Sequence, residues 1–367
     1  MMPFIRRHGA WIGFLVLALV VTVLTSDFSS GTFESRFISS RNLTNLIRQA
    51  SINGVLASGM TMVILTGGID LSIGSIVALA GVFTGISQVT WGWMNLGLTG
   101  AVGSGLLTIG IGGLCGLITG GLVAMLGIAP FVITLGMMVI TRGLALIFSN
   151  GSGISPMGDD IKMLGDEYLS SSVTMALFAI VLISLFLANR KKLMDSIFPV
   201  LTLGFFAYSF LNYRGLPVPV LFLLLALGTS AFLLTHTTWG RCVFAIGSNE
   251  QAAHWAGVPI RTTKWLVYTA MGLFSGLAAL LLTARLNSAV PTAGNLFELD
   301  AIAAVVIGGT SLKGGIGSVM GSFVGALTIA TLNNGMDLLE VPSFYQMVLK
   351  GIIIIIAVAL DRGQRQS

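Results

Sequence analysis

The chain has 367 residues, of which 54% are hydrophobic and only 9% are charged, and its mean hydropathy is +0.93. Because a soluble domain carries about 25% charged residues, this composition excludes an ordinary soluble protein and indicates a polytopic membrane protein. The formal net charge of +5 needs no nucleic-acid partner, since the cytoplasmic loops of membrane proteins collect lysine and arginine. The few cysteines and histidines are scattered, without the spacing of a disulfide framework or a metal site.

Apolar runs follow one another along the chain. A full membrane span needs about 20 residues, so most runs qualify as transmembrane helices and we expect about ten to twelve crossings in an all-α fold. The first run follows Arg6, Arg7 and His8 as in a signal peptide, but no small-residue cleavage site comes after it, so we interpret it as a retained helix. The run at 299–309 is too short to cross alone and is expected to be half a helix or a re-entrant segment. The runs are 11–26, 45–66, 71–90, 98–127, 130–149, 171–189, 195–211, 217–235, 263–285, 299–309, 315–333 and 343–360.

Residues 67–75 (GGIDLSIGS) lie between two apolar runs, so the carboxylate of Asp70 has no long polar loop around it. The glycine pair lets the backbone turn, and Asp70 or Ser72 can accept hydrogen bonds from the N–H groups that open the next helix. We therefore interpret this stretch as a break between two membrane helices. Irregular backbone at membrane depth is tolerated only inside protein or beside a water-filled cavity, so Asp70 is a helix cap, a pathway-lining residue, or both.

The distribution of basic residues predicts the orientation. If the N-terminus is inside and the runs alternate, the cytoplasmic segments hold 11 of the 19 lysines and arginines and the outside segments hold five. This bias predicts that both termini are cytoplasmic. The 11 lysines and arginines of the predicted cytoplasmic segments are Arg6, Arg7, Arg190, Lys191, Lys192, Arg241, Arg261, Lys264, Lys313, Arg362 and Arg365.

Two parts of the chain share an order of motifs. Glycines recur every four residues at 112, 116 and 120 and again at 317, 321 and 325, and a proline–aromatic motif and a basic–glycine pair follow each set. Each glycine stripe lets another helix approach closely. With the predicted orientation, the copies begin on opposite sides of the membrane, so we predict an inverted repeat with broken helices, as in transporters with a central substrate site. Repeat one covers about 45–149 and repeat two about 263–360, with connecting helices at 171–235.

Arg142 and Lys350 are the basic residues of those basic–glycine pairs, and neither lies in a long loop. A cation there must pair with an acid, bond helix-end carbonyls or reach lipid headgroups with an extended side chain. We expect the last of these for both residues.

The longest cytoplasmic segment, 236–264, contains the stretch AIGSNEQAAHWAGVP at 245–259. Ser248 and Asn249 are capping residue types, and good helix formers follow them before a Gly-Val-Pro stop. The sequence therefore predicts a short helix at 248–257. Such a helix suits docking to a partner protein or lying on anionic lipid, and both fit equally.

Three motifs together resemble the permease subunits of bacterial ribose/xylose-type ABC sugar importers: residues 67–75, GSNEQAA at 247–253, and LDAIAAVVIGGTSLKGG at 299–315. The likeness extends from about residue 41 to residue 361. Within the family, LNNGMD at 332–337 with VPSF at 341–344, NYRGLP at 212–217 and the apolar segment 195–211 resemble the D-xylose importers most, although permeases for arabinose, ribose or galactose share the main motifs.

The resemblance implies a single transmembrane permease domain, 1–367, in the bacterial inner membrane. Two permease chains, as a homodimer, would form the pore, a separate ABC ATPase would use the ATP, and a periplasmic sugar-binding protein would deliver the sugar. No Walker A motif occurs in this chain, which fits a separate ATPase, and no cofactor or metal is expected on it. Segment 236–264 would be the coupling loop, with small alanines placed against the ATPase and Glu250 paired with one of its basic residues. The residues expected to couple are Ser248, Asn249, Glu250, Ala252, Ala253 and Gly257.

Two other functional classes fit the residues less well. A self-sufficient secondary transporter usually carries buried carboxylate or histidine relays inside its helices, whereas Asp70 and Asp300 stand at segment starts and no histidine lies in an apolar run. An intramembrane enzyme needs a nucleophile–base constellation, and no catalytic residue is predicted here. The candidate pathway residues are polar and lie in or beside apolar runs: Asn53, Asp70, Ser72, Thr134, Asn287, Asn295, Asp300 and Asn333.

Overall fold

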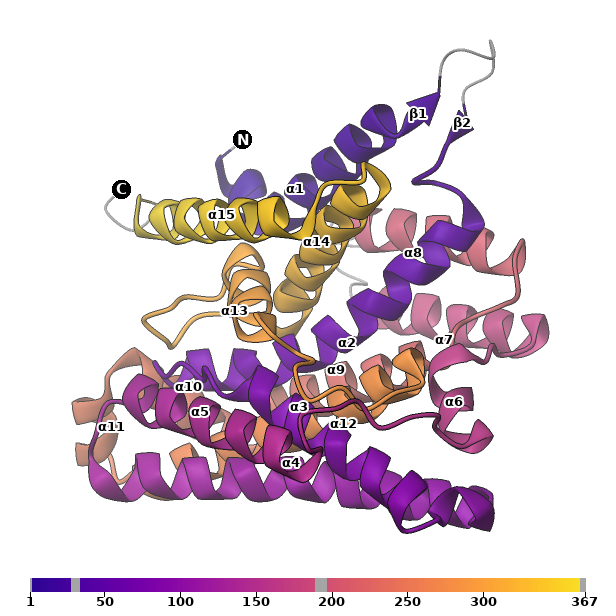
Figure 1. The fold of residues 1–367 in the computed structure, drawn as a ribbon. Helices are drawn as coiled ribbons and strands as arrows, with labels where there is room; N and C mark the ends of the chain where they lie inside the picture. Colours follow the sequence, from indigo (N-terminus) through magenta and orange to yellow (C-terminus); the bar gives the residue numbers. More distant parts are fainter. Residues whose placement is uncertain (1, 28–33, 189–196, 364–367) are drawn as a thin grey trace.

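The computed structural model describes residues 2–27, 34–188 and 197–363 (Figure 1). These residues are predominantly helical, which confirms the predicted all-α fold. The one sheet among them is a two-stranded antiparallel ribbon, β1 (Ser26–Asp27) and β2 (Glu34–Ser35), in which Ser26 is opposite Ser35. Long apolar helices satisfy their own backbone polar groups, and this is the requirement that a bilayer imposes.

The first half of the chain contains a broken pair of helices followed by two long ones. Its helices are α1 (Met2–Leu24), α2 (Ser40–Leu65), α3 (Ile73–Gly85), α4 (Leu98–Leu126) and α5 (Pro130–Phe148). A π-helical turn, η1 (Ile86–Thr90), and a 3-10 turn, η2 (Trp93–Leu96), connect α3 to α4. Gly127 ends α4 with φ +65°, and Pro130 opens α5 because its missing N–H is no loss at a helix start.

The connecting segment consists of a small helix and three longer ones. These are α6 (Asp159–Asp166), α7 (Ser171–Ala188), α8 (Ile197–Leu211) and α9 (Pro219–His236). The last three fall at 171–235, where connecting helices are predicted. The prediction omitted α6, which is too short and too polar to appear as an apolar run.

The second half begins with two short helices, α10 (Thr238–Ser248) and α11 (Glu250–Trp255), before the long α12 (Ile260–Leu286). The short helix α13 (Phe297–Ile307) follows, and α14 (Val319–Leu338) and α15 (Ser343–Gly363) complete the chain. The expectation that the run at 299–309 is too short to cross alone is confirmed, because α13 has only 11 residues, and half a helix and a re-entrant segment both stay predictions.

Five helices in the described part of the chain are long and apolar enough to cross a membrane. Three shorter apolar helices, His8–Leu24, Ser171–Ile183 and Phe198–Leu211, accompany them. The protein is therefore a multi-pass membrane protein, and the count of about ten to twelve crossings stays a prediction. The five are Ile73–Thr90, Leu98–Leu126, Pro130–Phe148, Pro219–His236 and Ile260–Leu286.

The helices α2 and α12 run in opposite directions between two ends of the molecule. Near the start of α2, Arg48 forms an ion pair with Asp166 of α6 at 3.7 Å, and the end of α12 at Arg285 lies against Gly165 of α6. At the other end of α2, the carbonyl of Leu65 accepts a hydrogen bond from the N–H of Gly315. The same carbonyl lies against Gly247 of α10. We name these the α6 end and the α11 end. An inverted repeat predicts this antiparallel arrangement, and the repeat itself stays a prediction.

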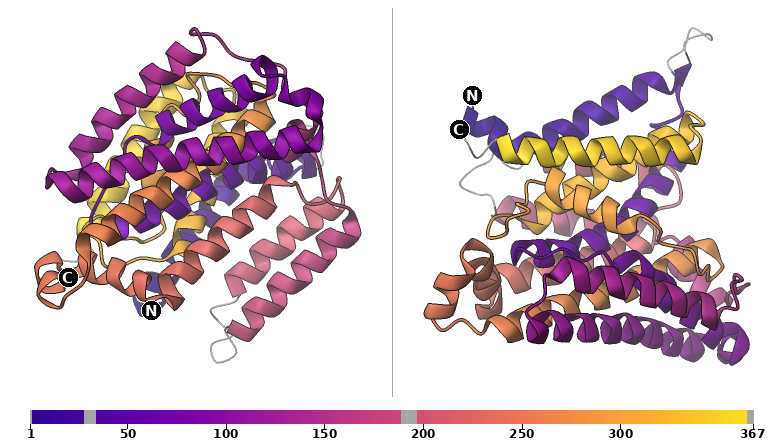
Figure 2. Two further views of the ribbon diagram at one scale, coloured as in Figure 1. Left: turned by 90° about the horizontal axis from the view of Figure 1, so that it is seen from below. Right: turned by 60° about the vertical axis from the view of Figure 1, so that its left-hand side comes forward.

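The start of α1 and the end of α15 lie toward the α11 end, and the two helices follow the same edge of the molecule (Figures 1 and 2). The ribbon β1–β2 and α6 lie at the other end (Figure 1). This places the predicted cytoplasmic loop on the same side as the two termini.

The glycine stripes serve close packing, but not at equivalent places. A Cβ at Gly112 or Gly116 of α4 would collide with the backbone of α12 at Gly272. The second stripe packs instead against α13, where Gly325 of α14 faces the carbonyl of Ala304. Thus the first stripe packs the two halves of the chain together, whereas the second packs α14 against α13 within the second half.

Candidate functional site

The first break, residues 66–72 between α2 and α3, buries the carboxylate of Asp70. This residue is 1% exposed, and its Oδ1 accepts the Ser72 N–H at 2.8 Å and the Ser72 hydroxyl at 2.6 Å. Thr134 of α5 donates its hydroxyl to the carbonyl of Ile69 at 3.3 Å. The structure therefore brings Asp70, Ser72 and Thr134 together, and both hydrogen bonds of Asp70 stabilise the turn that opens α3.

The second break, residues 287–296 between α12 and α13, lies against the first turn of α3, just after the first break. A Cβ at Gly74 would collide with the carbonyl of Gly294, so only glycine lets the two segments approach this closely. Asn287 ends α12 with φ +50°, and its Oδ1 accepts the N–H of Met157 at 3.0 Å. Asn287 thus holds the loop before α6, while Asn295 is exposed.

Arg142 holds the second break to α5. Its Nη1 donates to the carbonyls of Pro291 at 2.7 Å and Ala293 at 2.9 Å. The expectation that Arg142 extends to lipid headgroups is wrong. Irregular backbone leaves carbonyls without helical partners, and the guanidinium satisfies two of them.

Lys350 also fails to reach lipid headgroups as expected. Its Nζ lies 3.0 Å from Oδ2 of Asp300, and the two side chains are 18% and 5% exposed. The amide of Asn333 donates to the same carboxylate oxygen at 3.4 Å. A charge at this depth is tolerated only when it is paired, and α13, α14 and α15 each contribute one of the three groups.

These groups line a cavity of about 120 Å³, which we name the Asp300 cavity. It lies among α2, α12, α13, α14 and α15, and polar side chains dominate its wall. The lining residues are Gln49, Ile52, Asn53, Leu282, Arg285, Phe297, Asp300, Asn333, Asp337, Gln346 and Lys350.

The eight candidate pathway residues therefore separate into groups. Asn53, Asp300 and Asn333 line the Asp300 cavity, Asp70, Ser72 and Thr134 form the cluster at the first break, and Asn287 and Asn295 belong to neither. Sequence reasoning missed further polar residues of the cavity. Spacing would have revealed two of them, because Gln49 and Asn53 on α2, and Asn333 and Asp337 on α14, are four residues apart and share a helix face. The missed residues are Gln49, Arg285, Asp337, Gln346 and, as a cavity residue, Lys350.

At the α11 end, the short helix predicted at 248–257 is present as α11, and α10, which was not predicted, precedes it. Ser248 ends α10 and donates its hydroxyl to the carbonyl of Phe244 at 2.8 Å. Asn249 caps α11, since its Oδ1 accepts the N–H of Ala252 at 3.0 Å. Gly257 follows α11 in the left-handed region with φ +78°.

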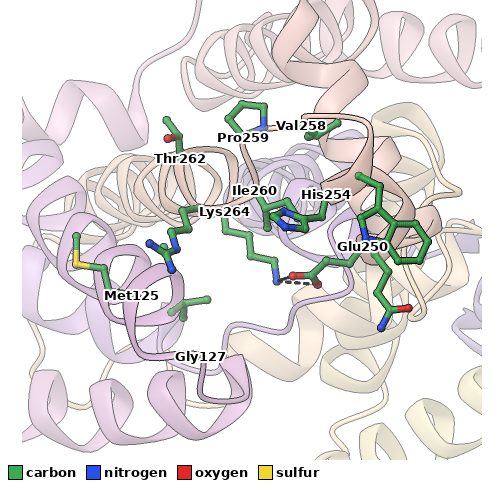
Figure 3. Close-up of a pocket in the computed structure, with 14 residues that line it drawn as sticks. Met125, Gly127, Glu250, His254, Val258, Pro259, Ile260, Thr262 and Lys264 are labelled. Atoms are coloured by element: carbon green, nitrogen blue, oxygen red, sulfur yellow. Dashed lines mark hydrogen bonds and ion pairs between the residues drawn. The ribbon is translucent and has the colours of Figure 1, made fainter.

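A groove of about 980 Å³ lies between α11, the start of α12 and the turn from α4 to α5 (Figure 3). Lys264 of α12 reaches both carboxylate oxygens of Glu250, at 2.7 and 2.9 Å, and so ties α11 to α12. Trp255 at its edge is 82% exposed. The lining residues are Val123, Ala124, Met125, Gly127, Glu250, Gln251, His254, Trp255, Val258, Pro259, Ile260, Arg261, Thr262 and Lys264.

Two features of the isolated chain bear on the contacts expected of α11, and the pairing of Glu250 with an ATPase stays a prediction. Ala253 is 5% exposed and faces its own chain, so it is not a contact surface for a partner, whereas Ala252 is exposed. Glu250 is already paired with Lys264. Within the described ranges, no group of three or more histidine, cysteine, aspartate or glutamate side chains is arranged to hold a metal ion.

Residues 42–358 match a protein family described as branched-chain amino acid transport system / permease component. The chain is 37% identical over 370 residues to the xylose transport system permease protein of Haemophilus influenzae, which covers 96% of this chain and 96% of that protein. It is 39% identical over 371 residues to the ribose import permease protein of Bacillus subtilis, covering 97% and 93%. The ribose import permease protein of Escherichia coli is 35% identical over 361 residues, covering 98% and 95%.

No solved structure matches the chain. The family match and the nearly full-length relatives show that this chain belongs to the family of membrane transport permeases just described. The resemblance to xylose and ribose permeases that the motifs predict is thereby confirmed.

Proposed function

We propose that this chain is the membrane-spanning permease subunit of an ABC importer for a monosaccharide, and that it passes the sugar from a periplasmic binding protein to the cytoplasm. The observation that carries this proposal is the length of the similarity to the xylose and ribose permeases, which leaves no part of the chain for a different activity.

A pentose is the proposed substrate class, and D-xylose is the first candidate. The motifs at 212–217, 332–337 and 341–344 support xylose, while the ribose permease of Bacillus subtilis is as similar to this chain as the xylose permease of Haemophilus influenzae. The family description names branched-chain amino acids. The nearly full-length relatives carry sugar names, which favours the sugar.

The two ends of the molecule receive different partners in this proposal. The α11 end faces the cytoplasm with both termini and docks a separate ATPase, and the α6 end faces the periplasm and receives the binding protein. A second copy of the chain completes the pore in the inner membrane. The basic residues Arg241, Arg261 and Lys264, in the helices on either side of α11, support this orientation.

The coupling surface is the groove beside α11 rather than the buried face of the helix (Figure 3). An exposed tryptophan at the edge of a groove is the kind of residue that dominates a protein interface, and truncating one typically costs about 2 kcal/mol or more of binding free energy. Replacing Trp255 with alanine should therefore weaken ATPase retention and abolish stimulation of ATP hydrolysis by the loaded binding protein. A matched control is Trp91→Ala, since Trp91 is 50% exposed and stands beside η1, next to α6 at the other end.

Unchanged ATPase stimulation in Trp255→Ala would leave α11 as a helix that lies on lipid. Equal losses in Trp255→Ala and Trp91→Ala would also contradict a coupling role for this groove, because the effect would then not depend on the end of the molecule.

Uptake in proteoliposomes tests the function as a whole. We expect the permease, reconstituted with its ATPase and binding protein, to import a radiolabelled pentose when ATP is present and no ion gradient exists. Uptake that needs a proton or sodium gradient and ignores ATP would instead indicate a self-sufficient secondary transporter. Preference for leucine or valine over every pentose would contradict the sugar assignment.

A further inference from the structure

The Asp300 cavity contains a buried polar atom that no described residue satisfies. Asn333 is 5% exposed, and its amide nitrogen donates to Asp300, but its carbonyl oxygen Oδ1 has no hydrogen-bond partner. A buried acceptor without a partner costs free energy, so native proteins rarely keep one unless water or a ligand completes it. This oxygen has almost no accessible surface, so a hydroxyl group in the cavity reaches it only after the amide of Asn333 turns toward the cavity.

The charges around the cavity balance. Asp300 and Asp337 supply two carboxylates, and Arg285 and Lys350 supply two cations, so their formal sum is zero. A site for an anion or a cation would carry a net opposite charge, because an unbalanced ligand charge is costly away from water. The cavity therefore favours a neutral ligand.

The composition of the wall further restricts the ligand. Eight of the eleven lining residues are polar, and Ile52, Leu282 and Phe297 are the apolar remainder. A branched-chain amino acid needs an apolar pocket for its side chain, whereas a neutral sugar needs several donors and acceptors with a small apolar wall for its ring C–H groups. Amide, carboxylate and ammonium groups of this density match vicinal hydroxyls.

The cavity is also placed for entry from the α6 end. Asp337, in the last turn of α14, is exposed, while Asp300 at the inner part of the wall is 4% exposed. Lys350 holds the carboxylate of Asp300 in place, so this acceptor is oriented before any ligand arrives.

We infer that the Asp300 cavity is a binding subsite for the hydroxyl groups of the imported monosaccharide, with Asn333 as a direct acceptor and Lys350 as a positioning residue. The inference rests on the proposed function and adds to it the residues that discriminate between sugars. A purely structural cluster is the competing interpretation, since the same groups join α13, α14 and α15.

The test compares two neighbouring asparagines of α14. Asn333→Leu keeps a similar size and removes the free acceptor. Asn334→Leu is the matched control, because Asn334 lies outside the cavity lining and exchanges amide hydrogen bonds of 2.8 Å with Asn42 of α2. Initial uptake rates of D-xylose, D-ribose and L-arabinose are measured in proteoliposomes, and each rate is divided by that of the unmodified complex with the same saturated binding protein.

A residue that contacts sugar changes these normalised rates unequally. We expect Asn333→Leu to change the ratio between two pentoses by about three- to tenfold, the effect of one neutral hydrogen bond. Asn334→Leu should lower all three rates by one factor or leave them unchanged. If Asn333→Leu does not insert, Asn53→Leu in α2 tests the same wall and leaves the Asp300–Lys350 pair in place.

Equal changes for all three sugars in both Asn333→Leu and Asn53→Leu would overturn the inference and leave the cluster structural. That result differs from failure of the proposed function, in which the unmodified complex imports none of the sugars with ATP. In that case both the importer function and the sugar subsite are contradicted.

Discussion

The carboxylate of Asp300 links α13 to α14 and α15 and also lines the Asp300 cavity. Burial removes it from water, so its charge depends on Lys350 of α15 and on the amide of Asn333. Replacing one partner of a buried ion pair leaves an uncompensated charge, whereas replacing both often costs little. The pair is therefore expected to behave as a unit.

Substitutions at this pair test that expectation. We expect Lys350→Met alone to destabilise the protein by about 3–5 kcal/mol, since Asp300 is then buried without its partner. The double variant Asp300→Asn with Lys350→Met should recover much of that loss. Thermal unfolding in detergent measures both. A double variant no more stable than Lys350→Met would show that the pair contributes no coupling free energy.

Arg142 is a second cation in an apolar helix, and its partners are of a different kind. It bonds two carbonyls of the second break instead of an acid. A cation in an apolar helix therefore does not reveal its partner by type alone, because carboxylates, carbonyls and headgroups all satisfy it.

Among the helices, α4 and α12 make the most extensive contact in the described part of the chain, and this contact joins its two halves. Gly112, Gly116 and Gly120 face backbone atoms of α12, and Gly272 and Gly276 face back. Without side chains between them, the helices gain dispersion over their whole length, which is the main attraction between helices in lipid.

A pair of glycine substitutions on α4 tests this contact. A Cβ at Gly116 would collide with the carbonyl of Tyr268, whereas a Cβ at Gly110 meets nothing within 4 Å. Valine has the same intrinsic helix cost at both positions, so the difference reports the contact. We expect Gly116→Val to lower stability by about 1–3 kcal/mol more than Gly110→Val.

Thermal unfolding and the yield of monodisperse protein measure the difference. Equal stability of the two variants would mean that α12 can move aside, and the stripe would then not be a rigid contact.

For the whole molecule, the two ends differ in chemistry. The α11 end carries a large groove with an exposed tryptophan, and the α6 end carries the mouth of a small polar cavity. The start of α1 and the end of α15 lie toward the α11 end (Figure 2). A molecule with different surfaces at its ends suits a protein that receives a ligand on one side and a partner on the other.

Reporter fusions test the orientation of these ends. A fusion at residue 250, in α11, should report the cytoplasm, and one near Asp160, in α6, should report the periplasm, because basic residues favour the cytoplasmic side. A further fusion after Lys192, which is outside the described residues, should also report the cytoplasm. A periplasmic signal at residue 250 would contradict both the orientation and the coupling role.

Much of the fold followed from local patterns in the sequence. Composition alone indicated the membrane class, run length predicted the short α13, and the connecting helices lie at 171–235 as expected. The residue types at 67–75 predicted a break at Asp70. These features depend on neighbours along the chain, namely the apolar length a bilayer requires and the backbone freedom of glycine.

Contacts between distant segments were decided only by the tertiary structure. Lys350 faces Asp300 fifty residues away, Gly116 faces α12, and Ala253 turns inward while Trp255 turns outward. Helix periodicity places polar residues on one face, but it does not say which helix that face will meet. The sequence thus determined which residues were able to form a polar site in the membrane. Packing of α2, α12, α13, α14 and α15 selected the ones that share a cavity, because a buried charge or amide is stable only where distant partners surround it.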